Sequence, residues 1–176
     1  MSTQLELDPV GRITAAAVGE PGRRTFYLQA RKDDVVVSLL VEKQQVALLS
    51  MHIEELLERV GPPEEAVPDI DSLDLEEPVA PSFRVGQIGL GYDERRDLVL
   101  MQCDELVSGE EEEERVVSPG RVRFWATRAQ MLALARRGER EVGAGRPICP
   151  MCGEPKEPEG HFCIRSNGHR EITRLT

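Results

Sequence analysis

Three cysteines and two histidines near the C-terminus have the types and spacing of metal ligands. Cys149 and Cys152 belong to a Cys-Pro-Met-Cys-Gly turn, in which two thiolates separated by two residues can reach one ion. The proline stiffens this turn, and Gly153 relaxes the backbone behind the second sulfur. A second half-site supplies His161 and Cys163. The pattern predicts a structural Zn²⁺ site with these four ligands.

The fourth ligand has two candidates. His161 is separated by one residue from Cys163, and a tight turn after Gly160 can direct both side chains to one ion. His169 stands in Cys-x5-His spacing with Cys163, which is within the range of finger-like ligand pairs. We favour His161, because His169 lies close to a chain end that we expect to fray.

Signatures of catalysis are absent from the sequence. It contains no G-x-S-x-G elbow, no H-E-x-x-H pair and no P-loop. Gly86, Gly89 and Gly91 reverse the order of a dinucleotide fingerprint and fall inside a predicted strand, where glycine marks a bulge or a close backbone approach. His52 falls within a predicted helix, where we expect it at the surface. We therefore predict no catalytic residue and no cofactor other than zinc.

A group of arginines surrounds the single tryptophan. Arg121, Arg123 and Trp125 share the strand face opposite Val122 and Phe124. The helix that follows adds Arg136 and Arg137. Because Trp and Arg are enriched at binding hot spots, these five residues form a candidate surface for a protein partner, the basic aromatic surface. The alternative is that Trp125 packs under the helix or against the zinc module.

Charge is distributed unevenly along the chain. The net charge is −10, but residues 1–114 hold 10 Lys/Arg against 26 Asp/Glu, and residues 115–176 hold 12 against 6. The acidic body disfavours nucleic acid, since attraction to phosphate supplies most non-specific affinity. The basic C-terminal third keeps accessory nucleic-acid binding as an alternative. The loop from Gly19 to Arg24 carries two guanidiniums and fits either an anion-binding loop or a plain turn.

The cellular compartment is predicted from three features. No apolar run is long enough to span a membrane, and the polar, acidic segment Met1 to Pro9 is not a secretory signal. Once the metal cluster takes three of the four cysteines, only Cys103 remains. This pattern fits the reducing cytoplasm rather than a disulfide framework.

Hydrophobic periodicity predicts strands followed by a helix, twice over. Strands are expected at 13–18, 25–30, 35–41, 83–90, 98–107 and 121–126. An amphipathic helix is expected over 43–60, and a second should start after Thr127 and end near Gly138 or fray toward Val142. Five prolines and seven carboxylates make residues 61–82 an acidic linker or long surface loop. The run Glu110 to Glu114 should form a solvated hairpin tip.

The repeated order defines the expected fold. Gln45 and Gln130 each lie near the start of a predicted helix, which suggests an internal duplication over 12–60 and 83–142. We predict an α+β domain over 1–144, with an antiparallel sheet built from two strand-strand-helix units and both helices on one face. Residues 145–176 then form a small zinc-ribbon-like module.

Several segments occur in the order seen in one known family. They are Arg24-Thr-Phe-Tyr-Leu-Gln-Ala30, Val37-Ser-Leu-Leu-Val-Glu-Lys43-Gln, Phe83-Arg-Val-Gly86, Cys149-Pro-Met-Cys-Gly153 and Gly160-His-Phe-Cys163-Ile-Arg165-Ser-Asn167-Gly168. Together they resemble an uncharacterised actinobacterial family, catalogued as a domain of unknown function, over nearly the whole chain. The resemblance implies a two-part layout of the chain. It also implies that the gene lies near the genes of a lipid-kinase-like and a phosphomutase-like protein, and hence that the three proteins share a pathway. It also favours His161, since histidine is not required at position 169.

The sequence thus predicts a zinc-containing cytoplasmic binding or adaptor protein with a protein partner. Accessory nucleic-acid binding is the first alternative. The second is an enzyme whose site lies between the two α+β units.

Overall fold

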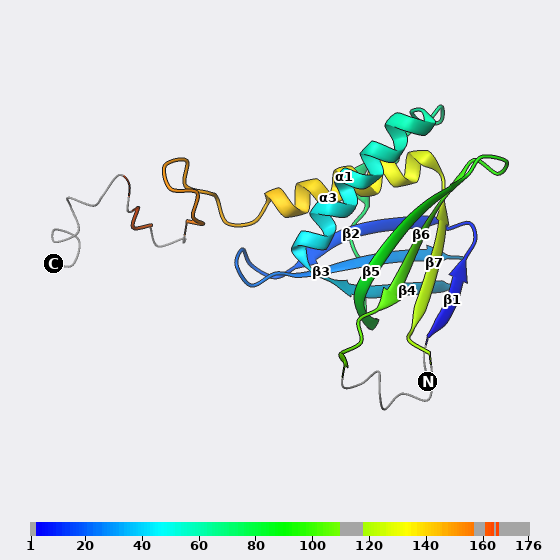
Figure 1. Ribbon diagram of the computed structural model, residues 1–176, viewed down its shortest axis with the longest axis horizontal. Coiled ribbons are helices and arrows are strands. Elements are labelled where there is room, and N and C mark those ends of the chain that lie inside the picture. Colours follow the sequence, from blue (N-terminus) through cyan, green and yellow to red (C-terminus); the bar gives the residue numbers. More distant parts are fainter. Residues whose placement is uncertain (1–2, 110–117, 157–160, 164, 166–176) are drawn as a thin grey trace.

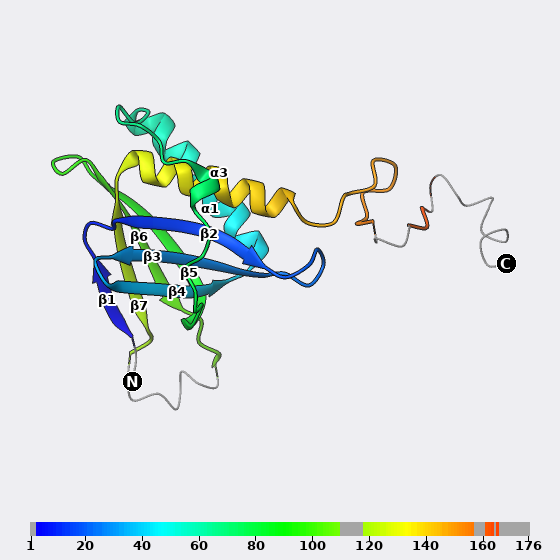
Figure 2. The ribbon, with the colours of Figure 1, turned by 180° about the vertical axis from the view of Figure 1, so that it is seen from behind.

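The computed structural model describes residues 3–109, 118–156, 161–163 and 165. Within these ranges, seven strands form a mixed sheet, and helices α1 and α3 lie on the same side of it in both views (Figures 1 and 2). The strands are β1 (Gln4–Leu7), β2 (Arg12–Val18), β3 (Thr25–Lys32), β4 (Val35–Val41), β5 (Pro81–Asp93), β6 (Leu98–Glu105) and β7 (Arg121–Ala126). The helices are α1 (Lys43–Val60), the 3-10 helix η1 (Ile70–Ser72) and α3 (Arg128–Gly143). The run Glu110 to Glu114 lies outside the described residues.

Alternation of apolar and polar residues builds the core as the sequence predicts. Every second residue of β7 is buried, namely Val122, Phe124 and Ala126. Helix α1 ends at Val60, where Gly61 adopts a positive φ of 101° and its N–H bonds Leu57 O. Helix α3 continues past Gly138 to Gly143, one residue beyond Val142, the alternative end. The largest fully buried side chains include Phe124, Leu7, Leu28, Leu39, Ile53, Met101, Met131 and Leu134.

The strand order corrects the predicted sheet. The order is β1-β7-β6-β5-β4-β3-β2, in which two antiparallel three-strand meanders, β2–β4 and β5–β7, lie side by side. The meanders meet at β4 and β5, which are parallel, and β1 is parallel to β7. The prediction of a purely antiparallel sheet is therefore wrong. Its physical reason is the long α1 crossover, because parallel neighbours require a connection that returns the chain to the same end of the sheet.

The sheet curls until its two edges meet at residues 8–11. Strands β1 and β2 are edge strands at opposite ends of the order, yet only four residues separate them. Val10 N–H donates to Trp125 O on β7 at 2.8 Å, and Gly11 N–H donates to Arg31 O on β3 at 2.8 Å. The resulting curvature makes the two meanders cross, as Figure 1 shows. The sequence pattern did not predict strand β1, because only Leu7 of this strand is buried.

Two glutamines make matching contacts at the starts of the two helices. The Gln45 carboxamide accepts from Glu42 N–H at the start of α1 and donates to Val85 O at 3.1 Å, where β5 bends. The Gln130 carboxamide accepts from Thr127 N–H and donates to Val10 O at 3.1 Å, between β1 and β2. Gln45 thus joins a helix cap to a strand bend, and Gln130 joins a helix cap to the connection between two strands. The two units share topology and this contact; their internal duplication stays a prediction, because shared topology does not establish common descent.

The acidic segment between α1 and β5 lies along the sheet. Leu73 is buried, and its carbonyl accepts from Thr14 Oγ1 at 2.7 Å. The buried Gln29 side chain bonds both the N–H and the carbonyl of Glu76, at 2.7 and 2.9 Å. The Glu76 carboxylate pairs with Arg31 at 2.8 Å. These contacts tie the segment to β2 and β3, so it is an anchored surface loop.

Candidate metal centre

The four predicted ligands are carried by a short turn and the segment that follows it. After α3, the chain forms a narrow hairpin in which Ile148 bridges Pro155. Cys149 N–H donates to Glu154 O and Gly153 N–H donates to Cys149 O, both at 2.9 Å. Gly153 has a φ of +76°, a conformation that glycine adopts without steric cost. The Cys-Pro-Met-Cys-Gly sequence therefore closes a tight turn that brings Cys149 and Cys152 to one side.

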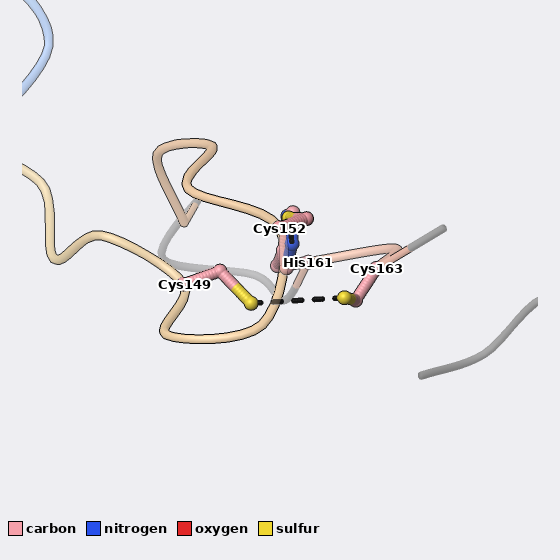
Figure 3. Close-up of side chains that lie close together, drawn as sticks. All are labelled: Cys149, Cys152, His161 and Cys163. Carbon is pink, nitrogen blue, oxygen red and sulfur yellow. Dashed lines mark hydrogen bonds between the residues drawn. The ribbon is translucent and has the colours of Figure 1, made fainter. Parts of the chain in front are cut away.

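The donor atoms of Cys149, Cys152, His161 and Cys163 converge (Figure 3). All four lie within 4.8 Å of one another. Cys149 Sγ and Cys163 Sγ are 3.7 Å apart, and Cys152 Sγ is 3.2 Å from His161 Nε2. Cys149 and Cys163 are buried, whereas the other two are half-buried. The sequence-predicted residues thus form one cluster that can bind a metal ion.

The separation of two sulfurs in the cluster fits a tetrahedral ion. Two sulfurs that each lie about 2.3 Å from an ion at the tetrahedral angle are about 3.8 Å apart. The 3.7 Å between the sulfurs of Cys149 and Cys163 matches that separation. Three thiolates and one imidazole are soft and borderline donors, which disfavour Mg²⁺ and Ca²⁺. The choice between His161 and His169 stays a prediction, because His169 lies outside the described residues.

The predicted basic aromatic surface is divided between two environments. On β7, Arg121 ion-pairs with Asp104 at 2.6 Å, and Arg123 Nε donates to Gln102 at 2.9 Å. Trp125 Nε1–H donates to Glu6 Oε1 at 2.6 Å, and the Arg96 guanidinium lies 4.9 Å from the indole centroid. Trp125 is therefore a half-buried residue held by two charged partners, neither of which the sequence pattern indicated.

The two helical members of the surface differ from each other. Arg136 is exposed on α3, whereas Arg137 is buried. Arg137 Nη2 lies 2.8 Å from Glu141 and 2.9 Å from Asp74, and its Nη1 donates to Ile70 O at 2.7 Å. Glu141 also pairs with Arg24, so one buried carboxylate joins two arginines. Arg137 is thus part of an ion-pair network; the function of the surface stays a prediction.

Two other sequence features have clear places in the structure. Gly86 lies at the bend of β5, where a Cβ would come within 2.9 Å of Leu106 Cα. The predicted close backbone approach is therefore observed there. His52 lines a hollow of about 460 Å³ between α1 and β5, together with Leu48, Leu56 and Ile88. This hollow lies between the two α+β units, where the alternative enzyme site was expected.

Comparison with known proteins identifies one family. The model of a family described as "Protein of unknown function (DUF3090)" matches residues 5–163, which include all four clustered ligands. No curated protein and no solved structure matched the chain. Among the helices that the structure describes, none has the length and apolar character needed to cross a membrane.

Proposed function

The chain belongs to the DUF3090 family of proteins of unknown function, and we propose that it is a cytoplasmic zinc protein that binds another protein and catalyses no reaction. The observation that carries the proposal is the convergence of three thiols and one imidazole within 4.8 Å. Four protein ligands complete the tetrahedron, so no coordination position is left for water or substrate. The zinc therefore stabilises the C-terminal segment.

Elemental analysis of protein purified with zinc supplied tests the metal. We expect about one zinc per chain, because the cluster provides one set of ligands. The Cys149→Ser variant should lose the zinc. Cys103→Ala is the matched control, since Cys103 lies buried in β6 away from the cluster, and it should keep the zinc. Zinc-free wild-type protein would refute the proposal.

The proposed partner surface is the face of β7 around Trp125. Its indole is half-exposed and positioned by Glu6 and Arg96, which is how a pre-organised aromatic anchor contacts a partner at low entropic cost. Arg121 is already paired with Asp104, which weakens its attraction for phosphate and favours a protein over nucleic acid.

Affinity capture from native lysate tests this surface. Trp125→Ala should weaken capture by about 2 kcal/mol or more, as the loss of an aromatic hot spot does, with zinc content unchanged. Leu48→Ala removes an exposed apolar side chain of α1 and is the control. Capture that Trp125→Ala leaves intact would exclude this face. Tight nucleic-acid binding that survives physiological salt would favour the nucleic-acid alternative.

A further inference from the structure

A hollow of about 650 Å³ lies where the sheet meets the metal-binding hairpin. The β2–β3 turn, the start of α1, the start of β5 and residues 145–155 all contribute to its walls. Its volume is in the range of small-molecule sites. Its apolar lining is Phe26, Tyr27, Leu40, Val41, Ile148 and the prolines at 81 and 155.

The charge of this hollow, called the basic hollow below, is opposite in sign to the net charge of the protein. Among the residues that the structure describes, four cationic side chains line it, Arg24, Lys43, Arg84 and Arg146, together with the carboxylate of Glu42. The chain as a whole carries −10. Cations gathered in a recess with low-dielectric walls focus their field and raise the local concentration of anions.

The cations are held in place by neighbouring groups. Arg24 pairs with Glu141 and lies 5.2 Å from the Phe26 ring centroid, so its guanidinium is fixed at the wall. Arg84 Nη1 donates to Glu42 at 2.7 Å, and both side chains are exposed. An incoming anion can replace this exposed carboxylate as the partner of Arg84, because surface ion pairs are weak.

Two of the cationic side chains of the hollow lie against glycines. A Cβ at Gly22 would come within 3.1 Å of Arg146 Nε, and a Cβ at Gly145 would come within 2.9 Å of Lys43 Nζ. Gly22 also has a φ of +90°, which L side chains rarely adopt. The Arg146 side chain thus reaches the β2–β3 turn and the Lys43 side chain reaches Gly145, while Ile148 and Pro155 of the metal hairpin add to the wall.

We propose that the basic hollow binds a small phosphate ester, with the phosphate held by Lys43, Arg84 and Arg146 and the organic part against Tyr27, Leu40 and Ile148. A phosphate ester carries several strong acceptor oxygens and nearly two negative charges, which match guanidinium and ammonium donors. This site is distinct from the proposed partner surface around Trp125. Its dependence on metal rests on the proposed zinc centre, because the hairpin supplies one wall.

Isothermal titration of the full-length zinc-loaded protein tests the proposal, with phenyl phosphate as probe and phenol and inorganic phosphate as its separated parts. Phenyl phosphate should bind more tightly than either part. Lys43→Gln and Arg146→Gln should each weaken the binding roughly tenfold or more, since each removes a charged hydrogen-bond donor to the phosphate. Arg95→Gln is the control of equal charge change, because Arg95 is exposed and lies outside the hollow.

Absence of phenyl phosphate binding, or equal weakening by Arg95→Gln, would overturn the proposal. A metal-free Cys149→Ser protein should bind roughly tenfold more weakly as its wall loses order. Undiminished binding by that variant would refute the coupling to the hairpin. Zinc content measured on the same samples separates failure of the metal centre from failure of the hollow.

Discussion

The curled sheet with its two helices buries a continuous apolar core, whereas among the described residues of the C-terminal segment only Cys149 and Cys163 are buried. Burial of apolar surface can stabilise the first region by itself. The described residues of the second region bury little apolar surface, so on the proposal of a zinc centre the metal supplies the free energy that orders its chain. On this proposal the metal and the core stabilise different parts of one chain, and the basic hollow lies where these parts meet.

Thiol reactivity should distinguish the two regions most strongly. Burial raises the pKa of the Cys103 thiol to about 12, which lowers its thiolate population roughly a thousandfold at neutral pH. After chelation of the metal, iodoacetamide should modify Cys149, Cys152 and Cys163 while Cys103 stays intact. Mass spectrometry of the digested protein reads out each site. If Cys103 of the folded protein were modified at a rate similar to that of the three cluster cysteines, the proposed difference between the two regions would be contradicted.

Removing the carboxylate of Glu141 should destabilise the sheet region by about 3–5 kcal/mol, because the half-buried Arg24 would lose the carboxylate with which it pairs and the buried Arg137 would keep only the exposed carboxylate of Asp74 among its described ion-pair partners. Urea unfolding of Glu141→Ala, followed by circular dichroism, measures the loss, and zinc content should not change. Glu139→Ala, an exposed residue of the same helix, should shift stability by about 0.5 kcal/mol or less. Equal effects from the two variants would contradict the network's role.

Substitution of Gly138 by alanine tests the close packing of the helices. A Cβ there would come within 2.6 Å of Ser50 Oγ and 3.0 Å of Val46 Cγ1 on α1, so we expect a loss of about 1–3 kcal/mol from overpacking. Gly143, the last residue of α3, has no atom within 4 Å of its built Cβ. Gly143→Ala should therefore leave stability unchanged or raise it slightly, as the higher helix propensity of alanine dictates. Thermal unfolding of both variants makes the comparison.

Chelation of the metal should have the smallest effect on the sheet region. The free energy of unfolding of the sheet region, measured in urea, should change by no more than about 0.5 kcal/mol, as for a surface change. The described core of the sheet contains no ligand of the cluster. Amide hydrogen exchange should accelerate at residues 148–156, where the hairpin bonds lie, and stay slow in β3 and β6. Accelerated exchange throughout the sheet would show that the two regions unfold together.

Local patterns predicted local structure well. The spacing of Val46, Leu49, Ile53 and Leu56 gave helix α1 with its observed bounds, and the Cys-Pro-Met-Cys turn indicated residues that the structure brings together. The sequence did not predict strand β1 or the two parallel strand pairs, because these depend on where the α1 crossover returns the chain and on how far the sheet curls. The basic hollow was not predicted for a similar reason. Arg24, Lys43, Arg84 and Arg146 are remote in sequence, and only the Gly19–Arg24 loop carried a hint of anion binding.

The zinc X-ray absorption spectrum of the purified protein tests the central claim most directly. Its fine structure reports the number, type and distance of the atoms bound to the metal. A closed structural site made by Cys149, Cys152, His161 and Cys163 requires three sulfurs at about 2.3 Å and one nitrogen at about 2.0–2.1 Å, with no oxygen. A shell with fewer sulfurs and a bound oxygen would mean an open coordination position, and would contradict the account of a purely structural metal.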